Sequence, residues 1–378
     1  MKEVYITKIS KFLPNQPVSN DEMEAKLGEI NGESSKAKRI VLRNNGIKQR
    51  YYALDSQANA THTNAELVKN AIEGLYGDSL CKTDIEVLSC GTSTPDQMLP
   101  SHTAMVHGLL ANGNLEINSA SGVCLAGMSS LKYGYMSVMS GNSNNAVCTG
   151  SERVSSWMRA DKFSKEVEEL KKLEEKPIIA FKKDFLRWML SDGAGAFLLQ
   201  NKPNNNSLSL RIDWMDGYSF AHELETCMYA GGDKQKDGTI KPWSDYNVNE
   251  LLEKSIFSIK QDVKLLDEFV LAKGVESMQM MFKKKNKNAS DLDYFLPHIS
   301  SYYFADKLKN LMKESNINIP ESSWFTNLDK VGNIGAASIY LMLEELFASG
   351  KLKKGQKILL SVPESGRFSY MYAHLTVC

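Results

Sequence analysis

Residues 332–350 read GNIGAASIYLMLEELFASG, the pattern of an amphipathic helix that begins with small residues and stops at a glycine. Residues 123–141 read VCLAGMSSLKYGYMSVMSG and follow the same plan. Cys124 and Asn333 each precede the final glycine of their stretch by 17 positions. This equal spacing indicates that the two stretches are matching parts of an internal repeat.

Matching strands flank the two predicted helices. Residues 84–93, DIEVLSCGTS, and 291–300, DLDYFLPHIS, each have an acidic start, an apolar run and a polar stop, which is typical of a buried strand. Residues 144–152, NNAVCTGSE, and 356–366, QKILLSVPESG, predict a further strand after each helix. Each half therefore repeats strand, long connection, helix and strand, which predicts an α/β protein.

The repeat divides the chain into two similar halves, residues 1–205 and 206–378. If the halves pack as pseudo-symmetric mates, equivalent helix starts and strand ends converge on one central site. Two stretches fit no repeat element, residues 155–185 and 214–287. We expect these to be insertions that build the entrance of a site.

The composition excludes several classes of protein. The 378 residues include 45 Lys and Arg and 45 Asp and Glu, so neither nucleic acid nor a membrane surface is an expected partner. The six cysteines are spread along the chain without metal-ligand spacing, so we expect reduced thiols and no metal. No signal peptide or membrane span is apparent, which favours a cytoplasmic location.

Three residues suggest chemistry. Cys124 follows Ser and Gly, which predicts a turn from strand to helix, where the helix dipole and free N–H groups favour a reactive thiolate. A small buried cysteine is the alternative. His298 ends a strand after a proline, and Asn333 opens a helix after a glycine, where an N-cap role is the alternative. Only the combination of the three points to a shared site.

Several segments resemble the ketoacyl synthase III family. The matching segments are SGVCLAGMSS at 121–130, LSDGAGAFLL at 190–199, FLPHISSYYF at 295–304, YITKISKFLPNQPVSNDEME at 5–24 and NNGIKQRYY at 44–52. DKVGNIGAASIYLMLEELFASGKLKKGQKILLSVPESG at 329–366 follows the family's helix, turn and final strand almost residue for residue. Together the matches span almost the whole chain in order.

The resemblance implies a thiolase fold, layered α-β-α-β-α, in a homodimer. It implies that Cys124 is the acylated nucleophile, while His298 and Asn333 donate N–H groups to the enolate that malonyl-ACP forms on losing CO2. The backbone N–H groups of Cys124 and Ser365 would form the oxyanion hole, with Gly366 beside the substrate. Substrates would be phosphopantetheine thioesters of coenzyme A or acyl carrier protein, with no tightly bound cofactor.

Other positions depart from the family pattern. The usual glycine-rich loop reads PESG at 363–366, which places Glu364 near the predicted site. No tryptophan matches the family's coenzyme A platform among residues 36–43, and Tyr303 replaces an arginine that aids carrier docking in some members. Acyl carrier protein is therefore a plausible donor, in fatty-acid synthesis or in a specialised pathway. The lysine run at 282–288 is either a carrier-docking patch or a solvated loop.

Two alternative functions stay open. An acyltransferase would pass the acyl group from Cys124 to an alcohol or amine, and a non-catalytic partner subunit would only shape the cavity of an active homologue. Retention of His298 and Asn333 argues against the first, and intact Cys124 argues against the second. The segment NNAVCTGS would suit dimer pairing at a sheet edge. Structural roles are expected for Asp192, His102, His107 and Glu152, and lining the site is the alternative for each.

Overall fold

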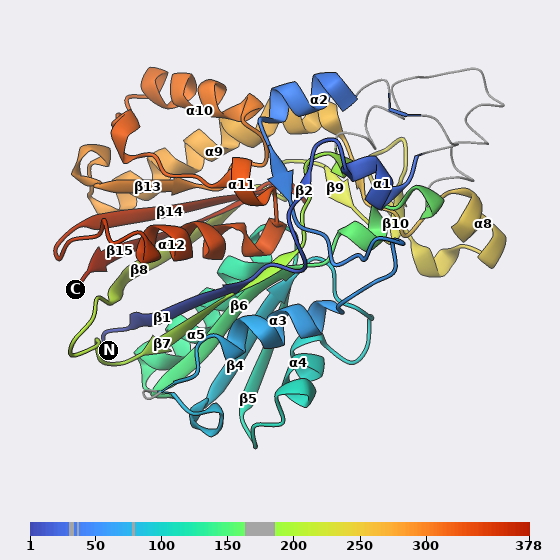
Figure 1. Cartoon of the computed structure of the whole chain (residues 1–378). Helices are drawn as coiled ribbons and strands as arrows, with labels where there is room; N and C mark the ends of the chain where they lie inside the picture. Colours follow the sequence, from blue (N-terminus) through green and yellow to red (C-terminus); the bar gives the residue numbers. More distant parts are fainter. Residues whose placement is uncertain (30–33, 36–37, 78–79, 163–185) are drawn as a thin grey trace.

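The structure is a computed structural model of the chain, and it describes residues 1–29, 34–35, 38–77, 80–162 and 186–378 (Figure 1). The strands are β1 Tyr5–Phe12, β2 Val18–Ser19, β3 Gln49–Arg50, β4 Val87–Thr92, β5 Glu116–Ser121, β6 Asn145–Glu152, β7 Gly193–Gln200, β8 Leu210–Ser219, β9 Met228–Tyr229, β10 Gly232–Lys234, β11 Ile240–Pro242, β12 Lys260–Gln261, β13 Tyr294–Pro297, β14 Lys357–Glu364 and β15 Ser369–Val377. The α-helices are α1 Met23–Leu27, α2 Lys38–Asn45, α3 Asn64–Glu73, α4 His102–Leu110, α5 Leu125–Ser140, α8 Val248–Glu253, α9 Val263–Lys285, α10 Tyr303–Glu314, α11 Leu328–Val331 and α12 Ser338–Ala348.

The central sheet repeats one pairing pattern. Its strand order is β13-β14-β15-β8-β1-β7-β6-β4-β5. From β1 through β7 and β6 to β4, the pairings are antiparallel, antiparallel and parallel. From β8 through β15 and β14 to β13, the same succession occurs. The strands β1 and β8 join the two sets where Tyr5 and Ile6 pair with Arg211 and Leu210.

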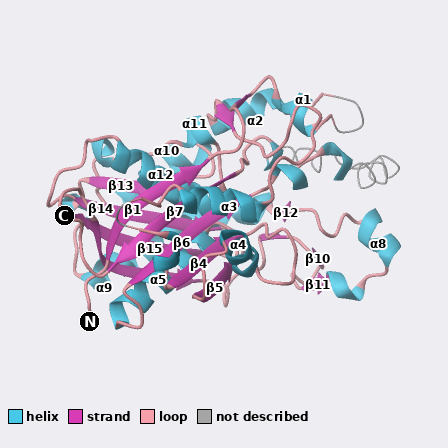
Figure 2. Ribbon diagram, turned by 60° about the horizontal axis from the view of Figure 1, so that its bottom comes forward, coloured by secondary structure: helices cyan, strands magenta, loops and turns pink. Residues whose placement is uncertain are grey.

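Helices cover the strands in layers, and this confirms the predicted layered α/β fold. Helices α3 and α4 pack on the strands around β4 and β7, while α9 and α10 pack together beyond β13 and β14 (Figure 1). Helix α5 contacts strands of both sets, and it shares one apolar core with α12. In Figure 2 the strands are enclosed by helices. Among the described residues, no helix has the length and apolar content needed to cross a bilayer.

Two sequence predictions are wrong in their extent. Residues 214–219 belong to β8, and α9 is a covering helix of the sheet, so the predicted insertion at 214–287 reduces to residues 220–262 with β9 to β12 and α8. Strand β6 lies between β7 and β4, so NNAVCTGS cannot be an edge. Both faces of this strand are buried, so its sequence does not show the alternation of polar and apolar residues that a half-exposed strand has. Of the other predicted insertion, 155–185, residues 163–185 lie outside the described residues.

Two glycines allow the start of α12 to approach α5 and β6. A Cβ on Gly127 would lie 2.1 Å from the carbonyl oxygen of Ala336, and a Cβ on Gly150 would lie 2.2 Å from the same oxygen. The Tyr340 hydroxyl donates a hydrogen bond of 2.8 Å to the Gly127 carbonyl. These contacts bring the turn that carries Asn333 against the helix that follows Cys124.

We expect Gly127→Ala to lower the free energy of unfolding by at least about 2 kcal/mol, because backbone atoms of two elements must separate to admit the methyl group. Gly108→Ala is the matched control in α4, since no heavy atom lies within 4 Å of its added Cβ. There the helix propensity of alanine adds up to about 1 kcal/mol. Urea unfolding of both variants measures the difference. Equal effects in the two variants would contradict the close-approach argument.

Candidate active site

Cys124 lies at the start of α5, as the sequence predicts, and it lines a buried cavity of about 110 Å³. The preceding β5 and Gly122 deliver the chain to this point, and the helix begins at Leu125. His298, Asn333 and Ser365 line the same cavity. Four predicted site residues, separated by up to 241 positions in the chain, therefore share one enclosed space.

His298 follows the last residue of β13 and is buried. Its backbone N–H donates 2.8 Å to the Ser361 carbonyl, which fixes the strand end beside β14. Its side-chain Nε2 atom has no hydrogen-bond partner among the described residues. Burial lowers the pKa of His298 to about 4, so the imidazole is neutral near pH 7. A neutral ring with its proton on Nε2 is a free N–H donor toward the cavity.

Asn333 has its side-chain amide oriented by local contacts. Its Oδ1 accepts 3.0 Å from the Gly335 N–H and 3.5 Å from the Ser338 hydroxyl. With the oxygen so engaged, the amide NH2 is the group available to the cavity. The predicted helix opening at Asn333 is displaced, because a 3-10 turn at Gly335–Ala337 intervenes before α12 begins at Ser338. That turn is what the Asn333 side chain caps.

The thiol of Cys124 does not carry the thiolate character expected from its helix start. The Glu364 Oε2 atom accepts hydrogen bonds from the N–H groups of Val123 at 2.9 Å and Leu125 at 3.1 Å. This carboxylate takes the position that a thiolate would use at the helix start. Burial, followed by the charges of Glu364 and Glu152, raises the pKa of Cys124. The sequence-based expectation of a depressed pKa is therefore wrong for the resting protein.

Glu152 is a second buried carboxylate on the cavity wall. Its Oε1 accepts from the backbone N–H groups of Ser93 at 3.2 Å and Ala336 at 3.1 Å. Its Oε2 accepts from the hydroxyls of Ser93 at 2.6 Å and Thr94 at 2.8 Å. Burial raises the pKa of Glu152 to about 7 in spite of these donors. Glu152 therefore ties the end of β4 to the turn that carries Asn333, which agrees with its predicted structural role.

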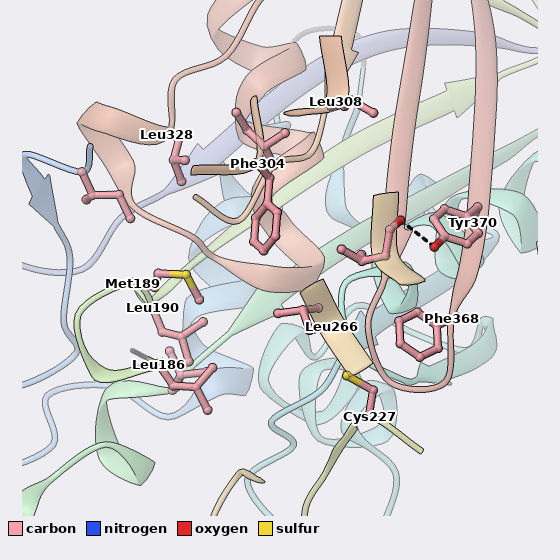
Figure 3. Packing of buried hydrophobic residues seen from close by; sticks show 14 of the residues in the cluster. Leu186, Met189, Leu190, Cys227, Leu266, Phe304, Leu308, Leu328, Phe368 and Tyr370 are labelled. Atoms are coloured by element: carbon pink, nitrogen blue, oxygen red, sulfur yellow. Dashed lines mark hydrogen bonds between the residues drawn. The ribbon is translucent and has the colours of Figure 1, made fainter. Parts of the chain in front are cut away.

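An apolar space extends from the thiol toward α9 and α10. In Figure 3, Phe304 of α10 and Leu266 of α9 face Met189 and Leu190. The other apolar lining residues include Leu186, Val270, Met278 and Leu308. The Tyr370 hydroxyl donates 2.8 Å to the Val270 carbonyl and fixes α9 to β15. The chemistry-bearing groups thus stand at one end of a space suited to a hydrocarbon chain.

Known proteins resemble the chain over almost its whole length. The family model described as 3-oxoacyl-[acyl-carrier-protein (ACP)] synthase III C terminal matches residues 282–367. The beta-ketoacyl-[acyl-carrier-protein] synthase III of Rickettsia akari is 26% identical over 355 residues, which is 94% of each chain. The corresponding protein of Clostridioides difficile is 24% identical over 357 residues, 94% of this chain and 93% of that one. The chain is therefore similar to the ketoacyl synthase III family over almost its whole length.

Several solved structures share the fold of this chain. AbyA1, a tetronic acid condensing enzyme, superposes with a TM-score of 0.77 at 19% identity over 99% of each chain. The 3-oxoacyl-[acyl-carrier-protein] synthase III of Aquifex aeolicus superposes with a TM-score of 0.70 at 20% identity, also over 99% of each chain. The predicted thiolase fold is thereby confirmed.

Three other residues singled out in the sequence lie away from the cavity. Asp192 accepts hydrogen bonds from the N–H groups of Ala53 at 2.7 Å and Ser155 at 2.9 Å, so it joins two loops. His102 is buried, with Nε2 3.4 Å from the Ser151 hydroxyl. His107 Nε2 lies 2.7 Å from the Gly113 carbonyl oxygen. These contacts are structural, as expected.

Gly366 and the lysine run have more specific positions. Gly366 lies outside the enclosed cavity and lines an adjoining open hollow of about 1190 Å³, together with Gly122 and Glu364. Its carbonyl accepts from the N–H groups of Cys227 at 2.9 Å and Met228 at 3.2 Å. The lysine run falls at the end of α9, where Lys284 and Lys285 pair with Asp216 at 2.8 and 3.7 Å. Two of its lysines are therefore already engaged.

The hydrogen bonds of Glu364 to the N–H groups at the start of α5 were not predicted from the sequence. The available signal was the replacement of a loop glycine by an acidic residue, but the direction of that side chain depends on contacts across the two halves. In the part of the chain that the structure describes, no group of three or more His, Cys, Asp or Glu side chains is placed to hold a metal ion.

We expect Glu152→Gln to change how stability depends on pH. The folded protein holds the pKa of Glu152 above its usual value, so this group costs nothing below about pH 4.5 and destabilises progressively as pH rises to about 7. The variant lacks that cost, and its Oε1 can still accept from both backbone N–H groups. The free-energy difference between variant and wild type should therefore grow by up to about 3 kcal/mol over this pH range.

Urea unfolding at pH 4.5, 6 and 7.5 measures this difference. Glu321→Gln is the control, because it neutralises an exposed carboxylate without touching the site. A difference between the Glu152 variant and wild type that stays constant with pH would contradict the argument.

Proposed function

We propose that this chain is an acyltransferase of the beta-ketoacyl-ACP synthase III type, which joins an acyl group to malonyl-ACP by decarboxylative Claisen condensation. One observation carries the proposal. A thiol, a neutral imidazole with an unpartnered Nε2, and an amide with its oxygen already engaged all line one cavity. A nucleophile beside two neutral N–H donors is the set that acylation and enolate formation require.

The first half-reaction transfers the acyl group. The Cys124 sulfur attacks the carbonyl carbon of an acyl thioester, and the carrier thiol leaves after a tetrahedral oxyanion collapses. The N–H of Cys124 and the N–H of Ser365 are the proposed oxyanion donors, since both residues line the cavity at the start of α5 and in the PESG loop. Gly366 is the proposed substrate neighbour on the side of the open hollow.

The second half-reaction forms the carbon–carbon bond. The bond between the malonyl carbon and its carboxylate breaks, CO2 leaves, and the electron pair becomes an enolate. The N–H donors of His298 and Asn333 stabilise the enolate oxygen. The carbon then attacks the acyl–Cys124 thioester, the carbon–sulfur bond breaks, and a β-ketoacyl thioester departs. The low pKa of His298 supports this role, because the ring stays neutral and keeps its N–H at neutral pH.

The substrates are proposed from the cavity and from the relatives. The apolar walls formed by α9, α10 and residues 186–190 favour a hydrocarbon acyl chain over a polar one. The names of the relatives include acyl carrier protein, which we propose as the partner that presents malonyl and acyl groups through phosphopantetheine. Coenzyme A is the second possible donor. Fatty-acid synthesis and a specialised pathway such as that of AbyA1 are both compatible with this chemistry.

A homodimer is proposed at the β5 edge. Strand β5 pairs with β4 on one side and ends the sheet on the other. Exposed apolar side chains lie at this edge and in the loop before α4: Met98, Leu99 and Ile117. An unpaired strand edge with apolar neighbours is suited to pairing with a second copy. A cytoplasmic location stays a prediction.

We expect incubation with acyl-coenzyme A and acyl-ACP to add the acyl mass to wild-type protein and to place it on Cys124. Cys124→Ala should remain unmodified, because the nucleophile is gone. Cys81→Ala, which removes an exposed thiol, is the control and should be acylated like wild type. Intact-mass and peptide mass spectrometry check this. An adduct that persists in Cys124→Ala would reject the assignment.

His298→Ala and Asn333→Ala should still accept an acyl group on Cys124 but condense with malonyl-ACP at a rate lower by on the order of 100-fold, because each removes one enolate donor. His222→Ala is the control, since that ring is exposed and distant in the sequence from the site. Single-turnover acylation and malonyl-dependent product formation separate the two steps. Normal condensation by both variants would favour the alternative, transfer of the acyl group to an alcohol or amine.

A further inference from the structure

Glu364 contacts the backbone on both sides of Cys124 and also lines the open hollow. It ends β14, and its Oε2 atom bonds to the N–H groups of Val123 and Leu125, the two chain neighbours of Cys124. A Cβ at position 122 would lie 3.0 Å from this oxygen, so the glycine there leaves the carboxylate its space. Glu364 lines the open hollow, whereas Cys124 lines the enclosed cavity. The carboxyl group therefore lines the hollow beside the segment that carries the thiol.

The charged side chains near Glu364 are engaged with other partners, so Glu364 is the carboxylate that bonds to the N–H groups at the start of α5. Glu152 lies on the cavity wall, where its own donors hold it. Arg153 pairs with Asp96 at 3.0 Å, and the Arg367 guanidinium donates 2.8 Å to the Leu224 carbonyl. Glu364 forms no ion pair with any described Lys, Arg or His. Burial raises the pKa of Glu364, and its two backbone hydrogen bonds oppose this shift.

We propose that Glu364 is the proton acceptor for the Cys124 thiol during acylation, and the donor that protonates the departing carrier thiol. The inference rests on the proposed function. As the sulfur–carbon bond forms, the S–H bond breaks and the proton passes to the Glu364 carboxylate. As the carbon–sulfur bond to the carrier breaks, the same proton goes to the leaving sulfur. Overall, the Cys124 thiol and the acyl thioester of the carrier become acyl-Cys124 and the free carrier thiol, and the net charge does not change.

The arrangement of the helix start requires such an acceptor. The Cys124 thiol cannot rely on the helix dipole alone, since a carboxylate already occupies the N–H groups on both sides of it. Ionising Cys124 beside an ionised Glu364 would place two adjacent negative charges in a buried site. Moving the proton between the two groups keeps a single negative charge there throughout. General acid–base assistance of this kind contributes about 100-fold or more to rate.

Glu364→Gln provides the test, because the amide keeps the length of the side chain and an oxygen that accepts both backbone N–H groups, but it neither carries charge nor accepts a proton. Two rates are measured on the same protein. One is alkylation of Cys124 by iodoacetamide between pH 6 and 9, which reports the thiolate fraction. The other is single-turnover acylation of Cys124 by an acyl-coenzyme A and an acyl-ACP. Peptide mass spectrometry assigns both adducts, thermal unfolding checks the fold, and Glu321→Gln is the control.

The proposal predicts opposite changes in the two rates. Loss of the neighbouring charge should speed alkylation at pH 7 by several-fold, while loss of the proton acceptor should slow acylation by about 100-fold. If both rates rise, Glu364 only suppresses the thiolate, and if both fall together, its role is structural; either result overturns the proposal. Unchanged acylation does so as well. Wild-type protein that alkylates on Cys124 but accepts no acyl group would instead reject the proposed function, and this role of Glu364 with it.

Discussion

The contact of Ala336 with the first half of the chain fixes the geometry of the site. Its carbonyl oxygen lies against Gly127 and Gly150 at a distance that admits no side chain on either, and its N–H donates to Glu152. Asn333 precedes this contact by three residues, and Gly127 follows Cys124 by three. The relative position of amide and thiol is therefore set by backbone atoms in a buried, closely packed layer, where small displacements are costly. The apolar chain of a substrate meets groups that are already in place.

The second constraint is electrostatic. The site holds a neutral imidazole, a protonated thiol and two carboxylates in a space with few polar atoms. In such surroundings each ionised group needs its own donors. Glu364 has the two N–H groups of the helix start, and Glu152 has a set of hydroxyl and backbone donors. Burial first, and then the charges of Glu364 and Glu152, raise the pKa of Cys124, so the thiol keeps its proton.

The sequence predicted the local elements around Cys124, His298 and Asn333 better than it predicted the extent of the central sheet. The equal spacing of Cys124 and Asn333 from their final glycines located the two matching helices, and the polar stop after an apolar strand located His298, because these signals are local. The sequence did not predict that residues 214–219 form a central strand or that 263–285 form a covering helix, since their partners are distant in the chain. The direction of the Glu364 side chain could not be predicted either, because its hydrogen-bond partners are also distant in the chain. An acidic residue at the end of a strand is usually solvated, and only the folded structure brings the start of α5 against Glu364.

The position of Glu364 also matters for the proton that the condensation step consumes. In the proposed condensation, the enolate displaces Cys124 from the acyl group and the sulfur leaves as a thiolate, so the resting state returns only after that thiolate gains a proton. Decarboxylation releases CO2 and supplies no proton, so one must enter from solvent. Glu364 lines the open hollow and bonds to the N–H groups on both sides of Cys124. Under the role proposed for it, this carboxyl group would pass a proton from the hollow to the thiolate, so that two adjacent anions do not persist once the product has left.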